Sequence, residues 1–301
     1  MMLLKTLIKN NYIHPEDQYI SLINDLIENG VHHDARNGDT LCGIGSAMYF
    51  SLEDNTIPIL TTKKVAQKTC LKELLWFMRG CTNNQLLKDQ NVKIWDLNAS
   101  REFLDSRGLS YEENDLGPVY GHQWRHFNAE YTNCHTNYQN QGIDQLQRVI
   151  DDIKNPETRY SRRHIVSAWN PCQIDQMALP PCHVMFQFHV LSNDKLSCTL
   201  YQRSGDVGLG VPFNIMSYSA LAHIVAHHCG LEASEFIYYL GNTHIYADHI
   251  EPLKQQVLRK PYDFPKFYIK NKHESIDDYV MEDFEVVGYK YHEKVEMKMS
   301  K

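Results

Sequence analysis

Three segments of the chain have the apolar spacing of amphipathic helices. Apolar side chains recur three or four positions apart over residues 19–27, and Gly30 closes this run. The same spacing is found over 71–78, followed by Gly80, and over 143–153. Side chains spaced in this way form one stripe along a helix, which can pack against a core. The sequence therefore predicts three helices with one buried face each.

From Val184 onward the apolar period is that of a β-strand. Apolar and polar side chains alternate over 184–190, Ser192-Asn193-Asp194 can form a turn, and alternation resumes over 196–200. A period of two places successive side chains on opposite faces of a strand. We therefore expect a β-hairpin in this part of the chain.

The register of this hairpin brings a thiol and a guanidinium together. If the turn centres on Asn193, paired positions sum to about 386, which places Cys182 opposite Ser204 and Arg203 opposite His183. A nearby cation favours the nucleophilic thiolate, so we expect the pKa of Cys182 to fall from the free value of about 8.5 towards neutrality. In the alternative interpretation, Cys182 only continues the buried face of the strand.

The remaining segments fit one continuous domain. A further helix is expected over 217–229 and ends at Gly230, and strands and loops follow Arg259. Residues 106–142 form a polar, aromatic-rich insert, and residues 1–14 carry no clear pattern. Without a repeat or linker, the pattern favours a single large α/β domain of the α+β type.

Composition narrows the class of protein. The chain has 301 residues, 43% of them hydrophobic, which is enough to bury a sizeable core. It lacks a run of about 18 apolar residues and a convincing signal peptide, and its eight cysteines form no CxxC pair. We therefore expect a cytoplasmic protein with reduced thiols, and a nuclear location also fits. A net charge of -7 argues against broad electrostatic binding to DNA, and without an apolar span we expect no membrane association.

Arginines and one asparagine offer a site for an anionic small ligand. Arg162 and Arg163 come just before an expected strand, and with Arg36 and Arg203 they could clamp a phosphate. The amide of Asn214 could read the O4 and N3–H edge of a uracil, since it offers both a donor and an acceptor. Taken singly, such arginines are more often solvated surface, and such an asparagine is more often a turn or cap residue.

The sixteen histidines raise the question of a metal site. His223 and His227 have the i, i+4 spacing of two ligands on one helix face, but no HExxH motif or third ligand accompanies them. We therefore expect no metal.

Three short motifs surround the residues discussed above. They read MALPPCH over Met177–His183, YQRSGD over Tyr201–Asp206 and GVPFN over Gly210–Asn214. Together they resemble the active-site core of thymidylate synthases. The similarity covers essentially the whole chain from about residue 16, with further matches at Glu73–Phe77, Lys93–Asp96, Gly117–Gly121, Arg162–Arg163, His244–Tyr246 and Asp277–Tyr279.

The resemblance implies a reaction and a set of catalytic residues. Members of this family convert dUMP to dTMP with 5,10-methylenetetrahydrofolate, which supplies both the carbon and the hydride and leaves as dihydrofolate, without a nicotinamide. Cys182 would attack C6 of the pyrimidine, Glu73 would organise proton transfer at O4, and Tyr120 would assist removal of the C5 proton. The implied catalytic set is completed by His183, Arg203 and Asp206.

The resemblance also implies two binding sets and an assembly. The fold would be a mixed β-sheet flanked by helices, packed back to back in a homodimer, with a catalytic domain at 16–301 and an N-terminal extension at 1–15. Arg162 and Arg163 would reach the site of the other subunit. The dUMP set is Arg36, Arg162, Arg163, Gln202, Arg203, Ser204, Asp206, Asn214, His244 and Tyr246. The folate set is Lys63, Ile94, Trp95, Asn98, Asp206, Leu209 and Phe213.

Three departures from the family pattern keep alternatives open. The arginine loop over 36–40 is one residue shorter and carries an added carboxylate, the chain ends in Lys301 rather than a small apolar residue, and Asn242 replaces an aspartate. The first two affect the closing of the site, so a deoxyuridylate hydroxymethylase that admits water is one alternative. An inactive nucleotide- or RNA-binding relative is another. The net negative charge gives RNA binding no independent support.

Overall fold

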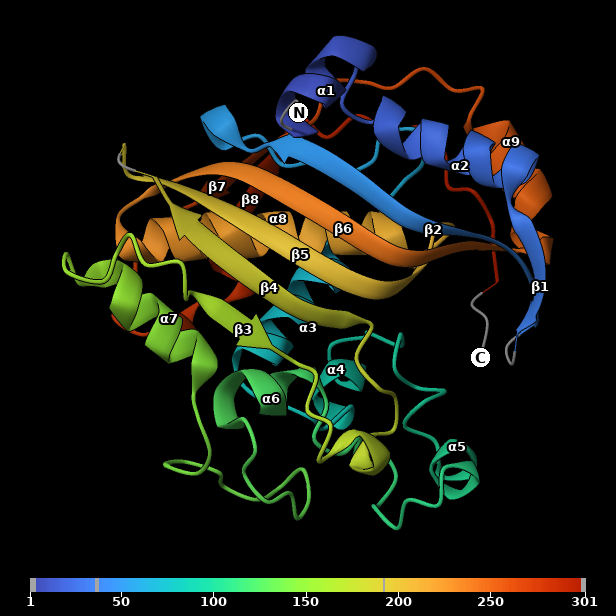
Figure 1. The fold of residues 1–301 in the computed structure, drawn as a ribbon. Helices are drawn as coiled ribbons and strands as arrows, with labels where there is room; N and C mark the ends of the chain where they lie inside the picture. The colour runs from blue at the N-terminus through green and yellow to red at the C-terminus, as the bar shows by residue number, and fades with distance from the viewer. Residues whose placement is uncertain (1–3, 36–37, 192, 299–301) are drawn as a thin grey trace.

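The centre of the molecule is a six-stranded mixed sheet. The computed structural model describes residues 4–35, 38–191 and 193–298. The strands are ordered β1-β2-β6-β5-β4-β3 (Figure 1), with β5 and β6 parallel and the other neighbours antiparallel. A separate two-stranded sheet pairs β7 with β8. The strands are β1 (Val31–Ala35), β2 (Gly38–Ser51), β3 (Ile165–Ser167), β4 (His183–Val190), β5 (Lys195–Asp206), β6 (Glu232–Tyr246), β7 (Lys266–Ile269) and β8 (Phe284–Val287).

Helices cover one face of this sheet and flank its edges. In Figure 1, α8 crosses behind β4–β6, while α1, α2 and α9 lie along the β2 side. This arrangement confirms the predicted α/β class with a mixed sheet flanked by helices. The α-helices are α1 (Leu4–Asn11), α2 (Asp17–Asn29), α3 (Gln67–Met78), α4 (Gln85–Lys88), α5 (Arg101–Ser106), α6 (Tyr120–His126), α7 (Gln145–Lys154), α8 (Gly210–Cys229) and α9 (Ile250–Gln256). The 3₁₀ turns are η1 (Glu53–Asn55), η2 (Ile174–Gln176), η3 (Ala247–His249), η4 (Ile276–Asp278) and η5 (Met281–Asp283).

The three amphipathic helices are confirmed as α2, α3 and α7, whereas one further helix begins earlier than expected and another was not expected. The helix expected from Ser217 begins at Gly210, because Pro212 lies in the first turn, where its missing N–H costs no hydrogen bond. It ends as predicted at Gly230, which has φ +73°. Residues 4–11, which carry no clear pattern, also form a helix, and within it Ile8 is buried.

Helix α8 is the centre of the hydrophobic core. It packs on β5 and β6, on α3 and on β7, so nearly every side chain in it is buried. This explains why its sequence is apolar all round rather than along one stripe. Among the described residues, no helix is long and apolar enough to cross a membrane.

The hairpin of β4 and β5 forms as predicted, with one shift. From Met185 to Val190 the paired residue numbers sum to 386. A β-bulge then displaces the register by one, so that His183 pairs with Gln202 instead of Arg203. The predicted pairing is therefore wrong at this end of the strand. Bulges re-aim side chains locally, and this one lies next to Cys182.

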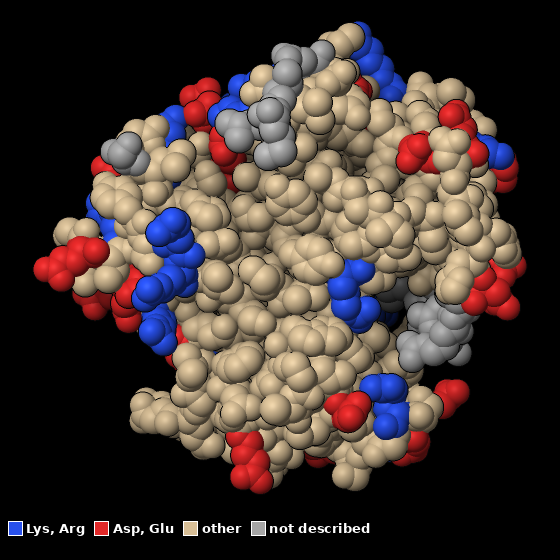
Figure 2. Space-filling model, in the orientation of Figure 1, with Lys and Arg blue, Asp and Glu red and all other residues tan. Residues whose placement is uncertain are grey.

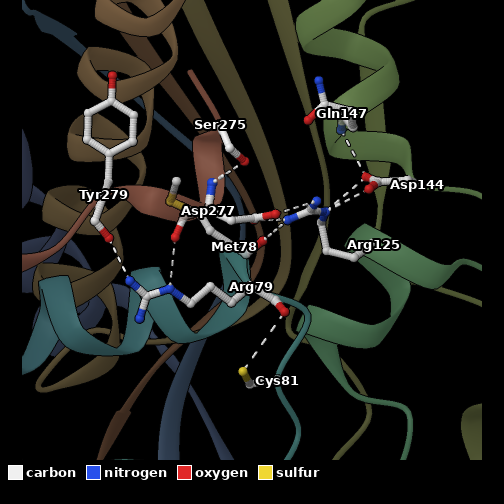
Figure 3. Close-up of polar contacts among 9 residues, drawn as sticks. All are labelled: Met78, Arg79, Cys81, Arg125, Asp144, Gln147, Ser275, Asp277 and Tyr279. Carbon is white, nitrogen blue, oxygen red and sulfur yellow. Dashed lines mark hydrogen bonds and ion pairs between the residues drawn. The ribbon is translucent and has the colours of Figure 1, made fainter. Parts of the chain in front are cut away.

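A buried arginine joins the helices below the sheet to a late segment of the chain. Arg125 in α6 donates from Nε to both carboxylate oxygens of Asp144, at 2.9 and 3.0 Å, and it also contacts the Asp277 carboxylate and the Met78 carbonyl (Figure 3). Next to it, Arg79 donates to the Tyr279 carbonyl at 2.7 Å. A buried guanidinium is tolerated only when its donors are paired, so these contacts fix η4 against α3, α6 and α7.

Candidate active site

Cys182 lies just before β4, with an arginine directly opposite. The bulge places Arg203, and not the predicted Ser204, across from Cys182, and the backbone N–H of Arg203 donates to the Cys182 carbonyl at 2.9 Å. The guanidinium of Arg203 donates to the carbonyls of Pro180 and Pro181, each at 2.9 Å. Both strands of the hairpin thus fix the position of the thiol.

The pKa of the thiol differs from the expectation. Burial raises the pKa of Cys182 above its ordinary value, and it outweighs the opposing effects of the Arg203 charge and of Tyr120. The cation is present as predicted, but without substrate the expected fall of the pKa towards neutrality is wrong. The thiol is therefore neutral at pH 7 until something further favours its ionised form.

Tyr120 in α6 contacts Cys182, and Glu73 in α3 is linked to Tyr120 through Trp95, whose ring lies 6.0 Å from that of the tyrosine. Glu73 is buried in α3 and accepts one hydrogen bond, at 2.7 Å, from the indole N–H of Trp95. Burial raises the pKa of Glu73 to about 7, although the Trp95 bond lowers it. Tyr120 opens α6, and its hydroxyl accepts the backbone N–H of Cys182 at 2.7 Å. A carboxyl group that titrates near pH 7 beside a nucleophile can act as a general acid or base.

His183 and Asn214 add a polar patch beside the thiol. The ring of His183 lies 5.1 Å from that of Tyr120, and burial lowers its pKa to about 4, with a contact from Asn214 opposing the shift. Its Nδ1 is buried and makes no hydrogen bond within the described part of the chain. Gln202 is buried close by and accepts the Tyr238 hydroxyl at 2.5 Å. A neutral histidine with one unused nitrogen can bond a polar ligand or a water molecule.

Asp206 forms the charged side of the site. Its Oδ1 accepts the backbone N–H groups of Gly208 at 2.8 Å and Leu209 at 3.3 Å. His249 Nδ1 lies 3.8 Å from the same oxygen, which is an ion-pair distance and not a hydrogen bond. Burial alone would raise the pKa of Asp206, but His249 is the main cause of a net fall, while the pKa of His249 itself is raised despite burial.

The C-terminal segment packs against this charged side. His249 Nε2 lies 2.7 Å from the carbonyl oxygen of Lys298, to which it donates. Met297 packs onto the main core, and a methyl group placed on Gly208 would lie 3.2 Å from its sulfur. The tail therefore rests on the loop that follows Asp206.

The residues assigned to folate lie around Asp206 and Trp95. Lys63 is buried and donates to the Gly208 carbonyl, and burial lowers its pKa to about 8. A methyl on Gly210 would lie 3.7 Å from Cβ of Asp206 and 3.9 Å from Oδ1 of Asn214, so Gly210 separates the two polar parts of the site. The remaining members of this set are half-buried and leave apolar surface open: Ile94, Asn98, Leu209 and Phe213.

The residues assigned to the phosphate and sugar are brought together only in part. Ser204 and Asp206 pair with Asn242 and His244 across β5 and β6, and the ring of Tyr246 lies 5.3 Å from that of His244.

Two of the expected phosphate ligands lie apart from this group. Arg162 and Arg163 are exposed before β3, and within residues 4–35, 38–191 and 193–298 their guanidinium groups form no hydrogen bond or ion pair with another site residue. Arg36 and Lys301 lie outside the described residues.

Two features of the structure have no counterpart in the sequence motifs. His249 contacts both Asp206 and Lys298 but belongs to no motif, and only its position three residues after Tyr246 marks it in the sequence. The histidine pair considered for a metal instead bonds backbone carbonyls, His223 that of Thr56 at 2.9 Å and His227 that of Asn271 at 3.2 Å.

Comparison with known proteins agrees with this geometry. The protein-family model for thymidylate synthase matches residues 17–301. The chain is 53% identical over 290 residues to the thymidylate synthase of Homo sapiens, covering 95% of this chain and 91% of that protein. It is 49% identical over 291 residues to thymidylate synthase 1/2 of Encephalitozoon cuniculi, covering 95% and 98%. It is also 53% identical to the bifunctional dihydrofolate reductase-thymidylate synthase of Paramecium tetraurelia, of whose length it covers 62%. The chain belongs to the thymidylate synthase family.

Proposed function

We propose that Cys182 is the nucleophile with which this thymidylate synthase converts dUMP to dTMP. The observation that carries the proposal is a buried thiol with an arginine directly opposite it and a tyrosine hydroxyl on its backbone N–H. A carboxyl group with a pKa of about 7, that of Glu73, is linked to the same tyrosine through the ring of Trp95. Attack of the Cys182 sulfur on C6 makes C5 of the pyrimidine a nucleophile. The folate co-substrate, 5,10-methylenetetrahydrofolate, supplies the one-carbon unit and the hydride.

Cys182 needs a proton acceptor, because its pKa is raised in the free site. Arg203 and the Tyr120 hydroxyl both lower that pKa and are already in place, so they favour the thiolate that attacks C6. Glu73 is about half ionised near neutrality and can exchange protons at the pyrimidine O4. Tyr120, held by the Cys182 N–H, faces the same reacting atoms.

Polar atoms that have no hydrogen-bond partner in the described residues match the polar groups of a uracil and a pterin. His183 Nδ1 is a buried group without a partner in the described residues, and the Asn214 amide next to it offers the donor and acceptor that O4 and N3–H require. Asp206 Oδ2 accepts no hydrogen bond within residues 4–35, 38–191 and 193–298, so it is free to accept N–H groups of a pterin. The half-buried Ile94, Leu209 and Phe213 offer apolar surface to the same ring system.

A homodimer completes the phosphate site in this proposal. The face of the sheet opposite α8 is uncovered, and Figure 2 shows that its centre carries few charged side chains. Tyr201 and Tyr239, paired across β5 and β6, are 44% and 43% exposed there. An apolar face of this kind favours a symmetric partner. Arg162 and Arg163, which are exposed and bound to no other site residue in the described chain, would then reach the partner's nucleotide.

The location and the domain boundaries complete the proposal. Residues 16–301 would form the catalytic domain and 1–15 an extension, in which α1 packs on β2 and Lys5 pairs with Glu235 at 2.5 Å. We place the protein in the cytoplasm, with the nucleus as a second location.

A product assay with a cysteine variant tests the nucleophile. The protein is mixed with dUMP and methylenetetrahydrofolate, dihydrofolate is followed by absorbance, and the nucleotide product is identified by mass. We expect dTMP and dihydrofolate in equal amounts, and a loss of at least about 10⁴-fold in Cys182→Ala. The matched control is Cys172→Ser, which removes an exposed thiol. Hydroxymethyl product without dihydrofolate would assign the alternative reaction, and full activity of Cys182→Ala would refute the nucleophile.

Mixing two inactive variants tests the dimer. Cys182→Ala is combined with the double variant Arg162→Gln, Arg163→Gln under conditions that exchange subunits. Heterodimers then contain one intact site, so a random mixture should recover roughly a quarter of the wild-type activity. No recovery, with exchange verified by tagged subunits, would show that these arginines act within their own subunit.

A further inference from the structure

A second group of reactive side chains lies in the loops around α6, away from the residues proposed for catalysis. Glu112 comes from the loop before α6, and Cys134 and His135 come from the loop after it. One potential ligand atom from each of the three side chains lies within 4.8 Å of the others. Two of them already interact, because His135 Nε2 contacts Glu112 Oε1.

The loop that carries Cys134 and His135 is held in place by buried groups. Asp115 is fully buried and accepts the backbone N–H of Cys134 at 2.9 Å and the Tyr131 hydroxyl at 2.6 Å. The Tyr138 hydroxyl accepts the backbone N–H of Thr132 at 2.9 Å, and its ring stacks on that of Tyr131. The backbone therefore presents the thiol and the imidazole from a fixed position, which lowers the ordering cost of binding a ligand.

A hollow of about 420 Å³ opens on two of these side chains. It is lined by Ser110, Tyr111, Glu112, Thr132, Asn133 and His135. The Glu112 and His135 side chains are 60% and 63% exposed, so both can turn without disturbing the core. There is room for an ion and for a water molecule or a small anion beside it.

We propose that Glu112, Cys134 and His135 form a binding site for Zn²⁺ or a divalent cation of the same class. Thiolate, imidazole and carboxylate are the ligands that zinc takes, and three protein ligands with one open position make a complete tetrahedral shell. Bond lengths of about 2.0–2.3 Å place tetrahedral ligands roughly 3.3–3.7 Å apart, so the three atoms must move by roughly 1 Å. A bound ion would link the loop before α6 to the loop after it.

Binding would release a proton. Zinc binds the thiolate form of a cysteine, so a thiol that becomes a ligand gives up its proton. The ion replaces that proton, and it also replaces the hydrogen shared by His135 and Glu112. Affinity should therefore rise with pH.

Competition with a chromogenic chelator tests the site on metal-free, full-length protein. We expect one Zn²⁺ per chain, and affinity at least about tenfold lower in Cys134→Ser and in His135→Gln. Cys172→Ser and Cys182→Ala should bind as the wild type does, since neither thiol belongs to the group. Bound Co²⁺ should give a thiolate charge-transfer band that Cys134→Ser abolishes.

Thermal unfolding of each variant without metal separates loss of a ligand from loss of the fold. A folded Cys134→Ser variant that binds Zn²⁺ like the wild type would overturn the proposal. Binding that disappears in Cys182→Ala but not in Cys134→Ser would overturn it equally, because the ion would then belong to the catalytic thiol.

Discussion

On the two sides of the candidate active site, the pKa values of the ionisable groups shift for different physical reasons. On the thiol side, defined by Glu73, Trp95, Tyr120 and Cys182, burial among aromatic rings raises the pKa of both the carboxyl group and the thiol. On the tail side, defined by Asp206, His249 and Lys298, an ion pair lowers the pKa of the acid and raises that of the histidine. The two acids thus differ because Glu73 is buried with an indole N–H for a partner, whereas the half-buried Asp206 has an imidazole and two backbone N–H groups around it. On the thiol side Glu73 can exchange a proton near pH 7, whereas on the tail side the ion pair favours the charged forms of Asp206 and His249.

The largest effect is expected from Glu73→Gln, which removes the exchangeable proton from the thiol side. Turnover should fall by about 10²–10⁴-fold, and the pH dependence of kcat/KM should lose its midpoint near 7. Glu157→Gln, at an exposed glutamate, is the matched control. Wild-type turnover in Glu73→Gln would remove this residue from the mechanism.

The same substitution should stabilise the fold. The folded pKa of Glu73, about 7, lies above its ordinary value of 4.5, so ionisation costs stability as the pH rises from about 4.5 to 7. Glutamine keeps the acceptor for Trp95 but cannot ionise. Urea unfolding should therefore show Glu73→Gln more stable than wild type above pH 7, by up to about 3 kcal/mol, and similar to it near pH 4.

A middle-sized effect is expected from His249→Gln, which breaks the ion pair of the tail side. The raised pKa of His249 gives stability below about 6.5 that is lost as the pH rises through the folded value. The lowered pKa of Asp206 gives stability above about 3.8 that is lost as the pH falls through the folded value. The pair thus contributes most between these limits.

Unfolding measurements at pH 5.5 and 8.5 would check this window. His249→Gln should lose roughly 1–3 kcal/mol at about pH 5.5 and less at about pH 8.5, and protease should release its C-terminal segment faster. His292→Gln, which changes another histidine bonded to a carbonyl near the tail, is the control. Equal losses at the two pH values would mean that the pair carries no charge.

The smallest effect is expected from Trp95→Phe, which removes the only hydrogen bond to Glu73 found in the described residues. Because that bond lowers the Glu73 pKa, the midpoint of the pH profile should move up from about 7 by roughly one unit. Trp76→Phe, whose indole N–H donates to the Asn83 carbonyl instead, should leave the midpoint in place. A downward shift would contradict the assigned role of Trp95.

Helices and strands with a regular apolar period could be predicted from the sequence. Local backbone geometry, and interactions between groups far apart in the sequence, could not. The apolar spacing gave the helices at α2, α3 and α7, and alternation gave the hairpin with its register from Met185 to Val190. The bulge at His183 has no pattern of its own, so the partner of Cys182 was predicted one residue away. Burial of the thiol depends on tertiary contacts, such as that with Tyr120 of α6, which explains why the direction of its pKa shift was predicted wrongly.

The motifs can be compared with the structure only for those parts of the site that a single subunit forms. Tyr120 and Arg203 contact the backbone of Cys182, and Glu73 bonds Trp95, whose ring lies 6.0 Å from that of Tyr120. Their catalytic roles stay predictions. His249 was missed because its two partners lie 43 and 49 residues away in sequence, and nothing local marks the contact. The roles of Arg162 and Arg163 remain predictions, since they depend on a second subunit.

The bonds of Arg125 set an order of events during folding. Its partner Asp144 is near in sequence, but Asp277 lies 152 residues further along the chain (Figure 3). Loop closure over such a distance is slow, and on the ribosome the arginine emerges long before this acid does. Until then α3, α6 and α7 can associate with only part of the guanidinium paired. Packing of η4 is therefore expected to be the last step in the folding of this region. A nascent chain that ends before Ser275 should remain incompletely packed there.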